Sequence, residues 1–193
     1  MLGGSFNPIH HAHLFTAEVA AAALGLERVL LVPAAQSPLK RRAVVPNADR
    51  LAMTRLAARG NPLLHVSSVD LDRPPPSYTV DTIVLLQKQF PDAELFLVLG
   101  VDALQDLLEW REPERLIDLA SLAVVARPGY PLRVPDEVRA KLGRRAARIR
   151  LLPMPQLEIS STDIRRRLAR GEPVRYLLPN AVERYIHGRG LYR

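Results

Sequence analysis

The chain has no cysteine among its 193 residues, and this absence excludes disulfide bonds and thiolate-bound metal ions. It also lacks any apolar run near the ~20 residues that a membrane-spanning helix needs, and no secretory signal peptide opens it. We therefore expect a cytoplasmic protein. Aromatic residues make up only 5% of the chain, too few for the base-stacking surfaces that single-stranded nucleic acids require.

Arginine, in contrast, is abundant. Lysine occurs only three times, yet lysine and arginine together number 27 against 20 acidic residues, which gives a formal net charge of +7. The arginines are spread over many segments, with local clusters at Arg144-Arg145 and at 165–167. A phosphate-rich small substrate explains this charge as well as RNA or DNA does, so we do not expect nucleic acid to be the main partner.

Strand-like and helix-like segments alternate along the chain. Apolar runs rich in strand-forming residues predict strands at 28–32, 64–68, 94–99, 121–126 and 148–152. Runs such as 29–32 and 95–99 have no polar alternation, which is typical of strands covered on both faces. Helical spacing predicts helices at 15–24, 48–59 and 79–90. Gly25 and Gly60 are expected to end the first two helices, and Asn47 to cap the start of the second. This order predicts an α/β fold, a Rossmann-like doubly wound parallel sheet with helices on both faces.

The composition fits one globular domain, since 48% of the residues are hydrophobic and 24% are charged. We expect a single domain over residues 1–193, with a small helical C-terminal part at 159–193. In a doubly wound sheet the ligand lies beyond the carboxyl ends of the strands. The segments that follow the predicted strands are therefore the candidate site.

The most informative of these segments is 3–13, which reads GGSFNPIHHAH. Its glycines allow backbone N–H groups to approach a ligand, just before a helix start where unpaired N–H groups favour phosphate. If that helix begins near Ile9 or His10, the imidazoles of His10 and His13 share one face and can donate to the same phosphate oxygens. No G-x-G-x-x-G or G-x-x-x-x-G-K-[ST] motif is present. A histidine-rich metal site is an alternative, although the H-E-x-x-H arrangement is absent.

Later strand ends carry further candidates. Lys40 ends a proline-bounded loop and can reach triphosphate oxygens as a mobile charge. Ser77 or Thr79 is expected to cap a helix whose free N–H groups suit a carboxylate. Asp102 suits paired ribose hydroxyls, and the flat indole of Trp110 suits a stacked pyridine ring. Lys40, the capping residues and Trp110 also have structural explanations, as an exposed lysine, a helix cap and a packed indole.

Near the C-terminus, three hydroxyl residues precede an arginine. Ser160, Ser161 and Thr162 stand at a predicted helix start, and Arg165 follows one turn later. Helix capping alone explains the hydroxyl groups, and Arg165 alone can be a solvated side chain. Together they form a second candidate anion site, which we expect to face the first.

Several of these motifs resemble those of a known enzyme family. The segment 3–13 is similar to the signature G-G-[ST]-F-[DN]-P-x-H-x-G-H of the nucleotidyltransferase superfamily, and 159–165 (ISSTDIR) to its second phosphate motif. The segments 76–82 (PSYTVDT) and 100–111, which begins with G-x-D-x-L and ends with Trp-Arg, resemble bacterial nicotinate mononucleotide adenylyltransferases. Two positions depart from the pattern: Ala12 replaces a glycine, and Leu39 stands where related enzymes have a histidine.

The resemblance implies an enzyme of NAD biosynthesis that transfers AMP from ATP to nicotinate mononucleotide, by direct in-line attack without a covalent intermediate. It implies Mg²⁺ bound with ATP and no metal held by the protein alone. It implies catalytic roles for His10, His13, Lys40 and Arg165. The residues implied to bind ATP are Gly3, Gly4, Ser5, Phe6, Gly100, Asp102, Arg127, Ser160, Ser161 and Thr162. Those implied to bind the nicotinate nucleotide are Asn7, Thr79, Trp110 and Arg111.

Three alternatives stay open at this point. The chain can be a nucleotidyltransferase for another acceptor, phosphopantetheine or nicotinamide mononucleotide. It can also be a non-catalytic relative that binds ATP or RNA, which the basic charge, Ala12 and Leu39 motivate. The sequence leaves open whether the protein forms a homo-oligomer.

Overall fold

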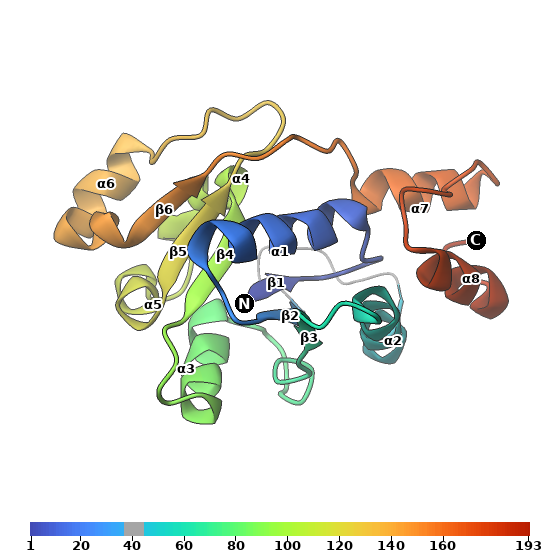
Figure 1. Cartoon of the computed structure of the whole chain (residues 1–193), viewed down its shortest axis with the longest axis horizontal. Coiled ribbons are helices and arrows are strands. Elements are labelled where there is room, and N and C mark those ends of the chain that lie inside the picture. Colours follow the sequence, from blue (N-terminus) through green and yellow to red (C-terminus); the bar gives the residue numbers. More distant parts are fainter. Residues whose placement is uncertain (37–44) are drawn as a thin grey trace.

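The computed structural model describes residues 1–36 and 45–193. Helices cover both faces of a central sheet, and two further helices lie at one end (Figure 1). In chain order the described elements are β1 (Leu2–Gly4), α1 (His11–Leu24), β2 (Val29–Pro33), α2 (Asn47–Ala58), β3 (Leu64–Val66), α3 (Thr79–Gln89), β4 (Phe96–Gly100), α4 (Val101–Gln105), the 3-10 helix η1 (Leu107–Glu109), α5 (Pro113–Leu119), β5 (Ser121–Val125), α6 (Asp136–Leu142), the 3-10 helix η2 (Gly143–Arg148), β6 (Ile149–Leu152), α7 (Ser161–Ala169) and α8 (Asn180–Arg189).

The sheet in this part of the chain has six strands in the order β3-β2-β1-β4-β5-β6, and every pair is parallel. β1 is central: Leu2 is paired with Leu31 of β2 on one side and with Val98 of β4 on the other. The strand order reverses between β1 and β4. In doubly wound sheets ligands bind at this switch point, beyond the carboxyl ends of the strands. The predicted fold class is therefore confirmed, and the sheet places the site after β1 and β4.

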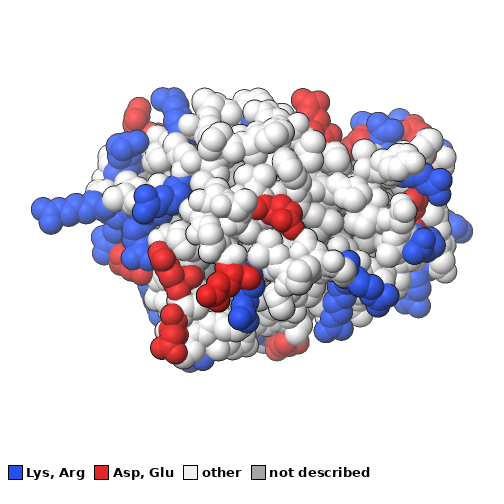
Figure 2. All heavy atoms as spheres, in the orientation of Figure 1, with Lys and Arg blue, Asp and Glu red and all other residues white. Residues whose placement is uncertain are grey.

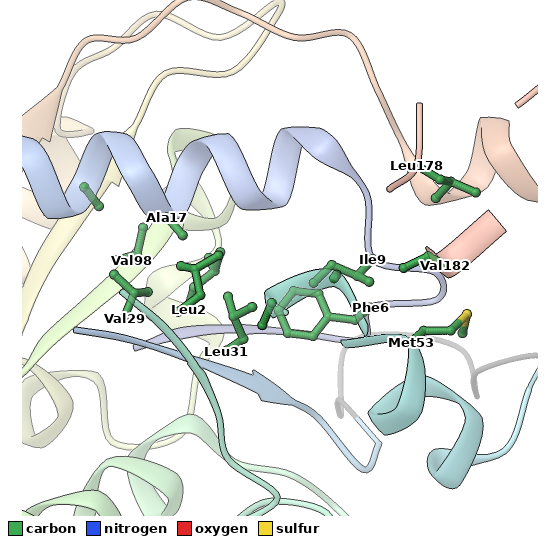
Figure 3. Packing of buried hydrophobic residues seen from close by; sticks show 14 of the residues in the cluster. Leu2, Phe6, Ile9, Ala17, Val29, Leu31, Met53, Val98, Leu178 and Val182 are labelled. Atoms are coloured by element: carbon green, nitrogen blue, oxygen red, sulfur yellow. The ribbon is translucent and has the colours of Figure 1, made fainter. Parts of the chain in front are cut away.

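Buried apolar residues form clusters on the two faces of the sheet. The first cluster joins α1, α2, α7 and α8 to the strands, and the second joins α3 to α6 to the opposite face. Figure 3 shows Phe6 and Ile9 of the turn after β1 lying among Leu31, Met53 and Val182. Burial of each such side chain contributes about 1.5 to 3 kcal/mol. The turn that carries the first motif is therefore fixed by the core beneath it.

Most of the predicted elements are present, and the corrections concern their ends. All five predicted strands exist, with ends shifted by no more than two residues. The first helix ends at Leu24 with Gly25 in the left-handed conformation, as expected. Asn47 is not the cap of α2, because Pro46 takes that place and the Asn47 side chain accepts a hydrogen bond from Arg50 instead. The prediction of one domain over 1–193 stays a prediction.

The basic side chains do not form one continuous surface on the face shown in Figure 2. Lys and Arg gather at the α6 end on the left and at the α7 and α8 end on the right, with few between them. Several are paired with acids, such as Arg145 with Asp118 at 2.7 Å. Among the helices that the structure describes, none is long and apolar enough to cross a membrane.

Candidate active site

The first motif forms the turn between β1 and α1. Phe6 has a positive φ of 43° and is only 2% exposed, so its side chain packs in the core and is not available to a ligand. α1 begins at His11, and His10 is its N-cap residue. The backbone N–H of His10 donates to Nδ1 of His13 at 3.2 Å. In a neutral His13 the ring proton therefore lies on Nε2, which makes Nε2 the donor.

The two predicted imidazoles lie together. The rings of His10 and His13 are stacked, with centroids 3.6 Å apart and planes inclined by 24°. His10 is only 2% exposed, and its Nδ1 has no hydrogen-bond partner within the described ranges. Burial, and after it the nearby charge of Arg127, lower the pKa of His10 to about 3. His10 is therefore neutral at physiological pH and can take part only as an uncharged hydrogen-bonding group.

The second motif packs directly onto the first. Ser160 caps α7, since its Oγ accepts the N–H of Asp163 at 3.1 Å. The hydroxyl of Ser161 donates to the carbonyl oxygen of Pro8 at 2.8 Å. Nη1 of Arg165 donates to the carbonyl oxygen of Asn7, also at 2.8 Å. The structure thus brings the two motifs together, as the sequence predicts, and sets the guanidinium of Arg165 against the turn after β1.

A second nitrogen of Arg165, Nη2, lies 3.2 Å from Oγ1 of Thr162. Two nitrogens of the Arg165 guanidinium are consequently held, one by the first motif and one by a residue of the same helix. A guanidinium fixed in this way loses less conformational entropy when it binds phosphate. This arrangement favours an anionic ligand over the turn.

The carboxyl ends of β4 and β5 contribute Gly100, Asp102 and Arg127. Nε of Arg127 lies 3.7 Å from Oδ1 of Asp102, too far for a hydrogen bond, and both atoms are buried without a hydrogen-bond partner in the described part of the chain. A Cβ added at Gly100 would lie 2.2 Å from Oδ1 of Asp102 and 2.8 Å from Nε of Arg127. Glycine is therefore required for these side chains to lie where they do. Their orphaned polar atoms indicate a site for a polar ligand.

The predicted pyridine site is assembled from two distant segments. Trp110 follows η1 and is half-buried against the second cluster, while Thr79 is the first residue of α3. The guanidinium of Arg111 lies 4.8 Å from the centre of the Tyr78 ring and 3.7 Å from Oδ2 of Asp81. The start of α3 and the segment after η1 are thus neighbours, although their positions in the chain are far apart.

The prediction that Ser77 or Thr79 caps the start of α3 was wrong for both residues. Tyr78 is the N-cap residue, and no side chain caps this helix start. Oγ of Ser77 accepts the backbone N–H of Gln36 at 3.0 Å, so it joins two loops instead of capping a helix. Within the described residues the first-turn N–H groups of α3 therefore have no side-chain cap, although the N–H of Asp81 donates to the carbonyl oxygen of Tyr78 at 3.1 Å.

Two buried residues near the site have no signal in the sequence pattern. The hydroxyl of Tyr192, at the end of the chain, donates to Oδ1 of Asn7 at 2.7 Å, and both residues are buried. The oxygen of the predicted ligand-binding Asn7 is therefore occupied. Arg50 of α2 is fully buried beneath the turn after β1.

Lys40 and Leu39 lie outside the described residues.

Comparisons with known proteins show the family to which the chain belongs. The model of the cytidylyltransferase-like family matches residues 1–167. Probable nicotinate-nucleotide adenylyltransferases are 46% identical in Thermomicrobium roseum and 48% in Thermus thermophilus, over all of this chain and 90% and 98% of theirs. The nicotinic acid mononucleotide adenylyltransferase of Plasmodium falciparum has the same fold, with a TM-score of 0.79 at 19% identity, over 99% of this chain and 95% of that one. The chain therefore belongs to the cytidylyltransferase-like family and, within it, to the nicotinate-nucleotide adenylyltransferases.

Proposed function

We propose that this chain transfers AMP from ATP to the 5′-phosphate of nicotinate mononucleotide, giving nicotinate adenine dinucleotide and pyrophosphate. The observation that carries the proposal is the meeting of the two motifs, where Ser161 and Arg165 bind the backbone beside the stacked His10 and His13. The full-length likeness to probable nicotinate-nucleotide adenylyltransferases supports it. So does the Plasmodium falciparum structure, which is a complex with NaAD.

ATP is assigned to the switch point of the sheet. The carboxylate of Asp102 accepts hydrogen bonds from the ribose hydroxyl groups, and Arg127 lies beside it at the same end of the sheet. The triphosphate lies over the turn formed by Gly3, Gly4, Ser5 and Phe6 and at the start of α7, with its residues Ser160, Ser161 and Thr162. Helix N-termini favour such anions through their unpaired N–H groups and dipole.

The acceptor nucleotide is assigned to the site between α3 and η1. Trp110 offers an apolar face to the pyridine ring, and the first-turn N–H groups of α3, from Thr79 on, suit the ring carboxylate. The side chain of Arg111 is engaged with Tyr78 and Asp81, so its backbone N–H is the group assigned to the substrate. The amide nitrogen of Asn7, whose oxygen is held by Tyr192, is the part of that side chain left for binding.

The chemistry is a direct displacement. An oxygen of the acceptor phosphate attacks the α-phosphorus of ATP, a new P–O bond forms, and the bond to pyrophosphate breaks. The acceptor phosphate is already ionised at neutral pH, so no strong general base is needed. Alignment of the two reactants can supply about 7 to 11 kcal/mol, against about 3 kcal/mol for one well-placed donor. We therefore assign most of the rate to positioning, with His10, His13, Lys40 and Arg165 stabilising the charge that develops.

We further propose that ATP enters with Mg²⁺. The side chains at the turn are hydroxyl groups and a cation, Ser161 and Arg165, and they suit phosphate oxygens better than they suit a bare cation. Mg²⁺ usually keeps several waters and binds through substrate phosphates, where it would neutralise charge on the triphosphate. Within the described residues no group of three or more His, Cys, Asp or Glu could hold a metal ion. The cytoplasmic location and the oligomeric state stay predictions.

The test is product analysis with MgATP and one acceptor at a time: nicotinate mononucleotide, nicotinamide mononucleotide or phosphopantetheine. We expect nicotinate adenine dinucleotide to form in strong preference to the other products. A preference for either other acceptor would reassign the acceptor site around Trp110. Binding of ATP without transfer to any acceptor would instead favour a non-catalytic relative.

A further inference from the structure

A buried guanidinium lies directly beneath the site. Arg50 of α2 has no exposed surface, and it donates to the carbonyl oxygen of Ser5, in the turn after β1. Its other nitrogen, Nη2, donates to the carbonyl oxygens of Ala34 at 2.6 Å and Ala35 at 3.2 Å, in the loop after β2. Asn47 fixes the guanidinium through a further hydrogen bond. One side chain thus ties together the loops that follow two neighbouring strands.

These bonds set which way three peptide groups face. In a trans peptide the carbonyl oxygen and the N–H of the next residue point in opposite directions. Where Arg50 holds the carbonyl of Ala34, the next N–H, that of Ala35, donates to Oδ2 of Asp70 at 3.1 Å. Where it holds the carbonyl of Ala35, the N–H of Gln36 donates to Ser77. Each of these two peptides is therefore fixed from both sides.

The third peptide, between Ser5 and Phe6, is fixed from one side only. Arg50 holds the Ser5 carbonyl, whereas the N–H of Phe6 donates to no group in the described part of the chain. This N–H points away from the guanidinium, and it belongs to the turn where the triphosphate is assigned. An unpaired backbone donor held in a fixed direction is suited to an anionic oxygen.

The charge of Arg50 is unusual for a purely structural residue. Among the described residues no carboxylate lies within 4.0 Å of its guanidinium, and its Nε is buried without a hydrogen-bond partner; the buried carboxylate of Asp70 attracts it from farther away. A buried charge without a close partner is costly, and apolar side chains of similar volume often stabilise a fold as well or better. Its presence here also places a fixed positive charge behind the phosphate-binding turn, where it attracts anions.

Resting on the proposed function, we propose that Arg50 is a positioning residue for the triphosphate: it holds the Ser5–Phe6 peptide so that the Phe6 N–H meets a phosphate oxygen of ATP. It touches no substrate and acts through the backbone. Its loss should therefore weaken ATP binding and slow transfer, with little effect on the affinity for the nicotinate nucleotide.

The experiment compares Arg50→Met and Arg50→Lys with Leu142→Ala. Leu142 is buried in α6, in the second cluster on the other face of the sheet, so its truncation lowers stability without changing these loops. Each variant is assayed at a temperature at which circular dichroism shows it folded. Steady-state kinetics are measured for both substrates, and calorimetry with a non-hydrolysable ATP analogue measures binding without turnover.

We expect Arg50→Met to lower kcat/KM for ATP at least tenfold and to weaken analogue binding, while KM for nicotinate mononucleotide changes less than twofold. Arg50→Lys should fall between Arg50→Met and the unchanged chain, because one ammonium cannot reach both loops at once. Leu142→Ala should lower only the melting temperature. If Arg50→Met does not fold, Arg50→Lys decides by the same split.

The proposal is overturned if the folded Arg50 variants behave like Leu142→Ala, with kinetics and analogue affinity unchanged. Equal loss for both substrates would also overturn it. Failure of the proposed function is a separate result, because the unchanged chain would then make no nicotinate adenine dinucleotide while the calorimetric comparison of the variants could still be made.

Discussion

Replacement of Gly100 by alanine tests the proposed ATP site by adding one atom, a Cβ, next to Asp102 and Arg127. Gly100 has φ −77° and ψ 156°, a conformation that alanine adopts without strain. The added Cβ, however, would lie 2.2 Å from Oδ1 of Asp102, 2.8 Å from Nε of Arg127 and 2.9 Å from its Cγ. Both side chains must move, and they can do so toward solvent, because they are 44% and 35% exposed. The fold should survive while the ribose site is displaced.

The size of the effect follows from the contact that is lost. A hydrogen bond to a charged group contributes about 1.5 to 3 kcal/mol, which corresponds to roughly 10- to 150-fold in kcat/KM for ATP. We expect this loss for Gly100→Ala, with KM for nicotinate mononucleotide within about twofold of its starting value. The assay is initial pyrophosphate release, with each substrate varied at saturating levels of the other.

The matched control is Gly188→Ala. Gly188 lies in α8, and a Cβ added there would meet nothing within 4 Å. This change should leave the kinetics alone and stabilise the helix by up to about 1 kcal/mol. If Gly100→Ala keeps the unchanged kcat/KM for ATP, Asp102 and Arg127 do not form the ribose site, and the assignment of ATP to the ends of β4 and β5 is wrong.

Three further predictions concern the other parts of the site. His13→Ala and Arg165→Ala should each lower kcat at least tenfold without unfolding the chain; normal steady-state kinetics would remove that residue from the mechanism. Trp110→Ala should raise KM for nicotinate mononucleotide more than KM for ATP, and the reverse pattern would exchange the two substrates. Because burial lowers the pKa of His10 from 6.5 to about 3, between these values the unfolded chain binds a proton that the folded chain does not. The free energy of unfolding should therefore decrease as the pH falls through this window, by up to about 1.4 kcal/mol per pH unit. Urea unfolding should show that this free energy depends less steeply on pH in His10→Gln than in the unchanged chain. Equal slopes for the two proteins would contradict the neutral state of His10.

The parts of the fold that follow from local patterns were predictable. The unbroken apolar run before Gly100 is typical of a strand buried on both faces, and β4 is such a strand. Gly25 ends α1 in the left-handed conformation, which glycine adopts without steric cost. These features depend on the backbone and on nearby residues, so the sequence contains them.

The parts that depend on distant partners were not predictable. Asn47 and Ser77 are ordinary capping residues, but their side chains bind Arg50 and the N–H of Gln36 because the folded loops bring those groups within reach. The hydrogen bonds from Arg50 to Ser5 and from Tyr192 to Asn7 join residues that are 45 and 185 positions apart, and no local sequence pattern predicts them. The predicted site residues came from motifs, whereas the residues that hold them came only from the structure.

The most direct test of the account is to incubate the chain with MgATP and nicotinate mononucleotide and follow all phosphorus species by NMR. The account predicts nicotinate adenine dinucleotide and pyrophosphate in equal amounts, each matching the ATP consumed, with formation abolished when Mg²⁺ is chelated. Release of ADP and inorganic phosphate, or ATP that binds but is not consumed, would contradict transfer of AMP at this site.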